Sequence, residues 1–323
     1  MTRNAKGNKK IWRRILIAFF LLMISAIGIY SYSLYNSVTK TVDSIHEPIS
    51  REKSEKRVTP ITLEKAEPFS VLMLGVDKRD GDTGRSDTMV VVTVNPDQNS
   101  VKMLSIPRDT RTEIIGRGFQ DKINHAYAFG GPEMSLDTVE NLLDIPLDYY
   151  LQVNMEGFLE IVDAVGGVTV QNDFSFKYGG YDFPKGEIDL DGKKALAYSR
   201  MRYEDPRGDF GRQQRQREII RAVIRKGAKL SSLGNYDEIL TALGNNVKTN
   251  LTFSEMYDIQ SKYKKAGKQI EEIEMKGTGG KIDGIYYYQV DDAEKQRVQE
   301  EFKSHLGIKK LFRTKSSKSS FSF

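Results

Sequence analysis

FSVLMLGVD, residues 69–77, begins the folded part of this chain and decides its architecture. A short apolar run bounded by turn residues is typical of a strand buried on both faces of a sheet. The loop KRDGDTGRSD follows it, and two more apolar runs, TMVVVTVNP and SVKMLSIP, come next. NPDQNS between those two runs has the Asn, Pro and Asp content of a hairpin turn. The region 69–107 therefore predicts three strands of one sheet.

Helical and strand-like patterns alternate along the rest of the body. INHAYAFG, PEMSLDTVENLL and MEGFLEIVDAVGG show helical spacing, whereas YYLQVN and VTV are typical of strands. Further helices are expected from about Leu190, over Asp209 to Lys226, Tyr236 to Leu243 and Ser254 to Lys265, with strands near Ile270 and Tyr286. This alternation predicts one α/β domain with a central mixed sheet flanked by helices.

The N-terminal region predicts a membrane anchor. Residues 15–35 carry no charge and are long enough to cross a bilayer, and the basic residues of 1–14 favour a cytoplasmic N-terminus. A cleaved signal peptide is the alternative, but no small-x-small site follows the run. The expected organisation is a basic cytoplasmic tail (1–14), one transmembrane helix (15–35), an extracytoplasmic linker (36–68), a catalytic domain (69–308) and a basic, Ser-rich disordered tail (309–323).

The charge of the chain is unevenly distributed. The net charge is +5, but the segments 1–14 and 309–323 carry +6 and +5 without any acidic residue, which leaves −6 for the body. A body of this charge on the outer side of a membrane argues against nucleic acid as a partner. The chain has no cysteine, which excludes disulfides, thiolate zinc sites and cysteine nucleophiles.

Two aspartates flank the first loop of the body. Asp77 ends the first predicted strand, and Asp87 precedes the second, with Arg85 between them. If these strands are neighbours, both carboxylates reach one end of the sheet, where hard oxygen ligands suit Mg²⁺ (or Mn²⁺) shared with substrate phosphates. The alternative is that both aspartates simply belong to turns.

Arginines are concentrated in YSRMRYEDPRGDFGRQQRQREII, residues 198–220. The guanidinium group is a planar fork of donors suited to phosphate oxygens. The expected anion-binding side chains are Arg200, Arg202, Arg212 and Gln216, the last two on one face of a helix that Asp209 caps, and Arg108 at the end of the third strand. The other arginines, including Arg217, Arg221 and Arg225, are expected on a solvated helix face.

The three histidines do not indicate a catalytic triad. His46 lies in the predicted linker and His305 near the C-terminus, while His125 on a helical pattern is expected to be structural. No G-x-S-x-G motif, Walker loop or metal-binding histidine pair is present.

The motifs together resemble the LytR-CpsA-Psr family of membrane-anchored extracytoplasmic bacterial proteins. The matching pieces, in the family's order, are LMLGVD with GRSDTM, LSIPRDT, INHAYAFGG, VGGVTV, and ALAYSRMR with DFGRQQRQ. They cover most of the chain from Phe69 to about Arg225.

This resemblance implies a phosphotransferase that moves an anionic glycopolymer, such as wall teichoic acid, from a polyprenyl diphosphate carrier to N-acetylmuramic acid of peptidoglycan. By analogy Asp77 and Asp87 would hold Mg²⁺, and a groove between sheet and helices would hold the lipid. The side chains implied for the diphosphate are Arg85, Arg108, Arg200, Arg202, Arg212 and Gln216, of which Arg108, Arg200 and Arg202 are also implied in catalysis with Asp77. The sequence leaves the general base open between Asp77 and Asp209.

Two other functions stay open at this point. One is a hydrolase that cleaves the lipid diphosphate with water, and the other is a non-catalytic membrane protein that binds or regulates wall polymers. The pair of aspartates with the full arginine set favours an enzyme, because phosphoryl transfer depends on positioning and charge neutralisation.

Overall fold

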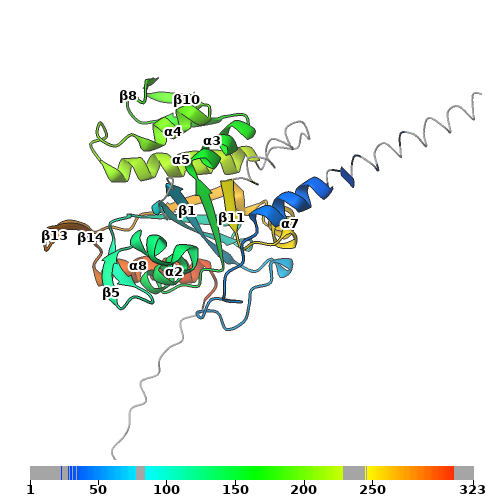
Figure 1. Cartoon of the computed structure of the whole chain (residues 1–323), viewed down its shortest axis with the longest axis horizontal. Helices are drawn as coiled ribbons and strands as arrows, with labels where there is room; N and C mark the ends of the chain where they lie inside the picture. Colours follow the sequence, from blue (N-terminus) through cyan, green and yellow to red (C-terminus); the bar gives the residue numbers. More distant parts are fainter. Residues whose placement is uncertain are drawn as a thin grey trace, which may run out of the picture.

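The chain folds around one six-stranded mixed sheet, with strand order β11-β6-β1-β2-β3-β12 (Figure 1). The computed structural model describes residues 23, 28, 30, 32, 33, 35–77, 84–227, 244 and 246–308. β1 is parallel to β6 and antiparallel to β2, and β3 is antiparallel to β2 and parallel to β12. The strands of this sheet are β1 (Phe69–Asp77), β2 (Arg85–Asn95), β3 (Ser100–Ile106), β6 (Tyr149–Asn154), β11 (Val247–Thr249) and β12 (Gln269–Ile273).

The three strands expected between residues 69 and 107 are confirmed. β2 and β3 form a hairpin in which Asn99 adopts a left-handed conformation (φ 49°) and its N–H donates to the Pro96 carbonyl at 3.2 Å. Asn tolerates this conformation better than most residues, so the turn chemistry of NPDQNS sets the register of the pair.

Two layers of helices cover the sheet, as Figure 1 shows. On one face α2 and α8 pack against Leu72, Leu74 and Met89 in the largest hydrophobic cluster. On the other face α3, α4 and α5 share a second cluster with the small sheet β7–β10. These elements are α2 (His125–Leu143), α3 (Met155–Ala164), α4 (Gly192–Arg200), α5 (Asp209–Gly227), α8 (Asp292–His305), β7 (Val168–Asn172) and β10 (Gly186–Leu190).

Most of the predicted helices are present. The two patterns before residue 143 form one element, α2, with a kink at Gly130 and Gly131 just before Pro132. Gly166 and Gly167 end α3 with φ angles of 77° and 75°, as their position predicted. The helix expected over residues 236–243 lies outside the described residues. Helix α8 was not predicted from the sequence.

Several short elements complete the fold. The hairpin β13–β14 projects from the body, and β4 and β5 form a second small ribbon beside α2 (Figure 1). The remaining elements are η1 (Leu63–Lys65), β4 (Arg111–Ile114), β5 (Phe119–Lys122), β8 (Phe176–Tyr178), β9 (Tyr181–Phe183), α7 (Phe253–Lys262), η3 (Ala266–Lys268), β13 (Thr278–Ile282) and β14 (Ile285–Gln289).

The segment 36–68, expected to be a linker, packs on the domain. Residues 35–45 are helical, and Ile45 and Leu63 are 3% exposed. Arg51 donates to Asp137 and Glu140 on α2 at 2.8 and 2.7 Å. The packed unit therefore begins before the expected boundary at Phe69, because apolar and charged side chains that the sequence scatters along this segment all meet partners on the body.

The expected anchor and tails fall mostly outside what is described. Segments 1–14 and 309–323 lie outside the described residues, as does most of 15–35. Among the described residues, no helix combines the length and the apolar character needed to cross a membrane.

Candidate functional site: an arginine cluster at the mouth of an apolar cavity

The ends of three strands carry the predicted polar residues to one edge of the sheet. Asp77, the last residue of β1, is paired in register with Arg85, the first residue of β2. The end of β3 lies beside the start of β2, because Ile106 is paired with Met89. Arg108 follows two residues later, so it belongs to the same edge. The antiparallel pairing thus brings together residues that are up to 31 positions apart.

Asp87 occupies a bulge in the pairing of β1 and β2. Gly75 is paired with Thr88 and Val76 with Ser86, which leaves Asp87 as the extra residue of β2. A bulge interrupts the ladder and changes the direction of nearby side chains, and bulges are frequent beside functional sites. Gly75 is required here, because a Cβ atom on it would come within 2.9 Å of the Thr88 Cβ.

Asp87 is the centre of a polar contact between β2, the β3–β4 loop and the start of α2. Its Oδ1 lies 3.0 Å from a guanidinium nitrogen of Arg108 and 3.4 Å from Nδ2 of Asn124. Asn124 is 5% exposed, and among the described residues its Oδ1 has no hydrogen-bond partner. An unpartnered buried oxygen is costly, so it marks a place where a ligand or cation would be stabilised.

The first turn of α5 completes the charge cluster. Arg212 approaches Asp209 at 2.7 Å, and Arg202 reaches the same carboxylate at 3.9 Å. Asp209 is the first residue of the helix rather than the cap expected from the sequence. The N-terminal end of a helix favours anions, so a phosphate here would meet the helix dipole as well as the guanidinium groups.

The electrostatics of the cluster leave it short of negative charge. Burial lowers the pKa of Arg212, and the neighbouring charges of Arg108 and Arg202 lower it further, against the opposing effect of Asp209. For Arg108 burial works in the same direction, but Asp87, Asp109 and Asp209 together raise its pKa. Lys122 also pairs with Asp109 at 2.7 Å, so four cationic groups share three carboxylates, and an added anion would relieve the repulsion between the cations.

Two predicted binders stand apart from these ion pairs. Arg85 and Arg200 are both exposed, and neither makes an ion pair with any other residue that the structure describes. Arg200 ends α4 and Arg85 begins β2, so both remain at the rim of the cluster with their donors accessible.

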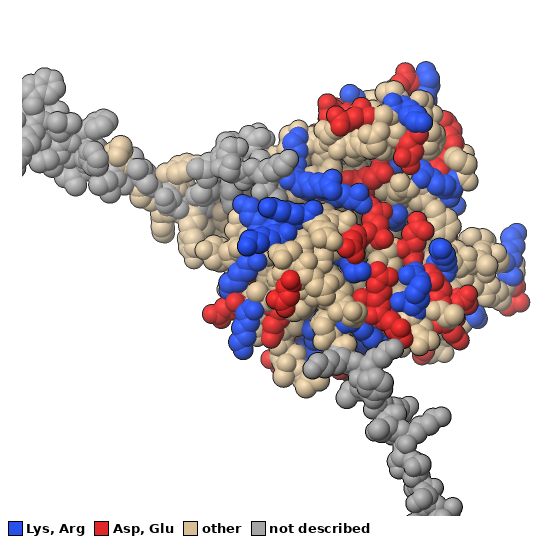
Figure 2. Space-filling view, turned by 180° about the vertical axis from the view of Figure 1, so that it is seen from behind, with Lys and Arg blue, Asp and Glu red and all other residues tan. Residues whose placement is uncertain are grey.

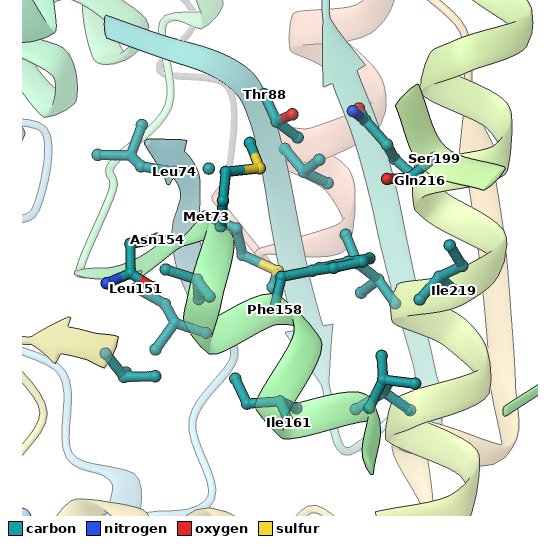
Figure 3. Close-up of a pocket in the computed structure, with 18 of the residues that line it drawn as sticks. Met73, Leu74, Thr88, Leu151, Asn154, Phe158, Ile161, Ser199, Gln216 and Ile219 are labelled. Carbon is teal, nitrogen blue, oxygen red and sulfur yellow. The ribbon is translucent and has the colours of Figure 1, made fainter. Parts of the chain in front are cut away.

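An apolar cavity of about 280 Å³ lies between the sheet and helices α3 and α5. Figure 3 shows Thr88, Ser199 and Gln216 at one end of the cavity and Ile161 at the opposite end, with Phe158 between them and Asn154 at the side beside Leu151. Gln216 therefore lies at the mouth of the cavity, one helical turn from Arg212. The sequence did not predict Thr88 or Ser199, because neither stands out in its segment before the strands and helices come together.

The arginine-rich segment also contains buried structural arginines, which corrects one prediction. Arg215 and Arg217 are 2% and 7% exposed, so they do not belong to a solvated face. Arg215 binds Asp205 at 2.5 Å and donates to the carbonyl of Tyr198, while Arg217 donates to Glu272 of β12 at 2.8 Å. Spacing alone placed them outside, because the partner of Arg217 comes from β12 and the partner of Arg215 is brought to it by the fold of the loop between α4 and α5.

His125, expected to be structural, begins α2 and pairs at 2.7 Å with Asp121 of β5, four residues earlier in the chain. The oxygens of Asp87 and Asn124 are donors of the type that Mg²⁺ prefers. In the part of the chain that the structure describes, no group of three or more His, Cys, Asp or Glu residues is placed to hold a metal ion. An ion at this edge would therefore complete its shell with water or with oxygens of a bound substrate.

Fold and site together define a class of protein: a mixed α/β domain that places an arginine-rich anion site at the mouth of an apolar cavity, suited to a molecule with an anionic head and an apolar tail. The chain belongs to the LytR_cpsA_psr family, whose model matches residues 32–304. The resemblance read from the motifs is thereby confirmed.

Several relatives are similar over nearly the whole chain. The polyisoprenyl-teichoic acid–peptidoglycan teichoic acid transferase TagU of Bacillus subtilis (strain 168) is 53% identical over 306 residues, which cover 95% of this chain and 99% of that protein. A crystal structure of Bacillus subtilis TagU is 54% identical and covers 74% of this chain and 97% of that one, with a TM-score of 0.62.

Two further solved structures share the fold. TagT bound to LI-WTA is 34% identical, covers 81% of this chain and 100% of that one, and has a TM-score of 0.70. An Enterococcus faecalis protein described as a transcriptional regulator is 45% identical, covers 78% and 92%, and has a TM-score of 0.71.

Proposed function

We propose that this protein is a phosphotransferase that moves an anionic glycopolymer of the teichoic acid type from a polyprenyl diphosphate carrier to peptidoglycan, with formation of a phosphodiester. The observation that carries this proposal is that the cluster of guanidinium groups lies one helical turn from Gln216, a residue that lines the apolar cavity. A lipid diphosphate is the class of molecule that needs both. The names of the TagU relatives supply the polymer and the acceptor.

The head of the carrier would lie on the arginine cluster. Arg108, Arg202 and Arg212 offer planar donor forks to the diphosphate oxygens, and Arg85 and Arg200 approach from the rim. In the reaction the bond between the two phosphates breaks, and the lipid phosphate leaves with added negative charge. Guanidinium groups fixed beforehand by Asp87 and Asp209 stabilise that charge without reorganisation.

The apolar tail of the carrier would enter the cavity past Gln216 (Figure 3). Its lining comes from the sheet and from α3 and α5, with Met73, Phe158 and Ile219 among the apolar side chains. Burial of prenyl methylene groups there is favourable by about 0.8 kcal/mol for each CH₂. The cavity therefore supplies affinity for the carrier, while the arginine cluster acts on the reacting phosphates.

The acceptor hydroxyl must lose a proton to a carboxylate at this edge of the sheet. Asp77 at the end of β1 and Asp209 at the start of α5 are the two candidates. Mg²⁺ or Mn²⁺, held by Asp77 and Asp87 with the free oxygen of Asn124, would neutralise phosphate charge when bound. We place the domain outside the cell membrane, anchored by residues 15–35, where carrier and peptidoglycan are both accessible.

Transfer is tested with the full-length protein in detergent, Mg²⁺, a polyprenyl diphosphate-linked teichoic acid precursor and peptidoglycan oligomers. The expected result is a product in which polymer and peptidoglycan are joined by a phosphodiester, detected by mass spectrometry. Release of polymer without attachment would indicate a hydrolase instead, and binding without turnover would indicate a wall-polymer-binding or regulatory protein. Either outcome would overturn the proposal.

The description of the Enterococcus faecalis relative raises transcription as a second possibility, but the surface does not favour nucleic acid. Figure 2 shows a run of basic side chains along one side of the face that it presents, and acidic and basic side chains interspersed over the rest. The body of the chain has a net charge of −6 once the two basic termini are set aside. A protein that neutralises several phosphates of a duplex needs a continuous basic face.

A further inference from the structure

The site has an outer side that the proposed carrier leaves unused. Along α5, Ile219 and Ile220 line the cavity, Gln216 lies at its mouth, and Arg212 and Asp209 form the ion-pair cluster. Phe210 lies between Asp209 and Arg212 in the first turn, at the outer end of the helix. With a rise of 1.5 Å per residue, Phe210 lies about 9 Å along the axis from Gln216. The helix thus runs from the lipid cavity to the charge cluster, and Phe210 lies level with that cluster.

Phe210 does not stand alone at this rim. Its ring is 49% exposed and meets the ring of Tyr288 on β14 with centroids 5.5 Å apart and an angle of 63°. The Tyr288 N–H donates to the carbonyl of Asp109 at 2.8 Å, next to Arg108. The projecting hairpin is therefore fixed to the loop that carries a predicted catalytic arginine.

A third ring extends this surface along the hairpin. Tyr286 lies on the same face of β14 as Tyr288, two residues or about 7 Å farther from the body, and is 46% exposed. Its ring covers Gly279 of β13, because a Cβ atom on that glycine would come within 3.0 Å of two ring carbons. Glycine here lets the tyrosine lie against the neighbouring strand and present its other side to solvent. We call the two exposed rings, Phe210 and Tyr286, the aromatic ridge. Tyr288 is only 5% exposed and supports the ridge by packing against Phe210.

We propose that the aromatic ridge binds the sugar rings of the acceptor, the glycan strand of peptidoglycan, and holds its hydroxyl beside the arginine cluster. This inference rests on the proposed transferase function. Pyranose rings have apolar C–H faces that pack on aromatic rings, while their hydroxyl groups remain in water. A ridge that runs outward from the site along a projecting hairpin matches a stiff strand of linked sugars better than a single group.

The charges of the hairpin favour the acceptor glycan, rather than the polymer of the donor, as the ligand of the ridge. On the hairpin the charged residues are Lys281 and Asp283, one of each sign. A polymer of repeating phosphates would be attracted by a row of cations, which the ridge does not have. A glycan strand with neutral sugar rings has no such requirement.

Two pairs of variants test this proposal in the full-length protein. Phe210→Ala removes the ring nearest the site, and Tyr257→Ala removes another exposed ring, on α7, as its control. Gly279→Ala displaces the Tyr286 ring without changing any aromatic residue. Its control is Gly280→Ala, where an added Cβ meets only the Gln289 side chain at 3.5 Å.

Binding of lipid-free peptidoglycan oligosaccharides is measured by calorimetry, and transfer by varying acceptor and donor separately. We expect Phe210→Ala and Gly279→Ala to raise the acceptor Kd and KM about tenfold, with the donor KM and kcat unchanged and both controls like the parent. Unchanged acceptor binding in both variants, or a raised donor KM, would overturn the ridge as an acceptor site. A parent protein that binds the oligosaccharides but does not transfer would contradict the transferase proposal and leave the ridge intact.

Discussion

At the scale of single residues, the partners of each arginine decide its role. An arginine whose partners leave some of its N–H donors free can bind a ligand, and one whose donors are all used cannot. Arg108 pairs with Asp87 at 3.0 Å and retains part of its fork toward the cluster, whereas Arg215 is fully engaged by Asp205 and two carbonyls. Both side chains carry the same guanidinium group, but one keeps donors available for an anion and the other has a structural role. The difference comes entirely from their neighbours.

Arg108→Ala is expected to reduce transfer at least a hundredfold, because a guanidinium aimed at developing phosphate charge contributes about 3 kcal/mol or more to transition-state stabilisation. The rate with saturating donor and the melting temperature are measured together. Arg225→Ala, an exposed arginine of α5, is the matched control and should behave like the parent protein. Equal rates for the two variants would remove Arg108 from the site.

At the scale of elements, the connection between α4 and α5 sets the positions of Arg202 and Asp209. Asp205 inside this loop is fully buried and pairs with Arg215, whose side chain is 3% exposed. Arg215 also donates to the carbonyls of Tyr198 and Met201, and its guanidinium lies over the Phe176 ring. Gly211 leaves room for Asp205, since a Cβ atom there would collide with the carboxylate. One buried ion pair thus joins the end of α4 to the first turns of α5.

Asp205→Asn should destabilise the domain by about 3 kcal/mol, because removal of one partner leaves Arg215 buried without a counter-charge. Urea unfolding measures this loss. We also expect kcat of Asp205→Asn to fall, because Arg202 and Asp209 lose their support. The double variant Asp205→Asn/Arg215→Met is expected to recover stability but not kcat. A double variant with full activity would show that the ion pair between Asp205 and Arg215 does not position the site.

Helix α8 is fixed to the sheet by a buried histidine. Nδ1 of His305 lies 2.7 Å from the Thr93 hydroxyl, and Nε2 lies 2.9 Å from the Ser100 hydroxyl. Burial, assisted by Lys102, lowers the pKa of His305 from 6.5 to about 4. The folded state therefore holds this side chain neutral in a pH range where the unfolded chain would protonate it.

This depressed pKa predicts a loss of stability in mild acid. The contribution of neutral His305 to the free energy of unfolding is complete above pH 6.5 and is lost as the pH falls from there through about 4. In that range the unfolded chain binds a proton at this side chain and the folded protein does not. A full shift of this size corresponds to about 3 kcal/mol. Urea unfolding at about pH 7 and pH 5 should show a larger loss for the parent than for His305→Gln. Identical losses would contradict the assignment.

At the scale of the whole molecule, the segment that precedes β1 belongs to the domain. Arg57 pairs with Asp148 at 2.7 Å, and the Tyr150 hydroxyl donates to the carbonyl of Glu47. Asp148 and Glu140 are nearly buried, with side chains 5% and 6% exposed, and both take their cations from this segment. The segment that precedes β1 is thus fixed to the domain.

A chain that begins at Phe69 is therefore expected to be less stable than one that begins at Asn36 by about 5 kcal/mol or more, because two buried carboxylates lose their partners. Both versions are compared by urea unfolding. Arg51→Ala in the longer chain should reproduce part of the loss. Equal midpoints for the two versions would mean that the segment only lies on the surface.

The sequence alone determined the class of the domain. Apolar runs such as FSVLMLGVD, the turn residues of NPDQNS and the paired glycines after α3 act locally, so the strands, the hairpin and the helix end were predicted from their own residues. The motifs indicated the family for the same reason, since each is a short stretch with its own chemistry. The arginine-rich segment was predicted to bind an anion in this way.

Tertiary structure decided which residues of those stretches meet. The bulge at Asp87, the Asn124 oxygen that has no partner among the described residues, and the cavity beside Gln216 depend on register and on helix packing, which bring together positions far apart in the chain. Burial of Arg215 and Arg217 depends on acids that the folded chain supplies. Local pattern fixes an element because its forces act between neighbours, whereas a site is made of contacts between elements, and those exist only once the chain is folded.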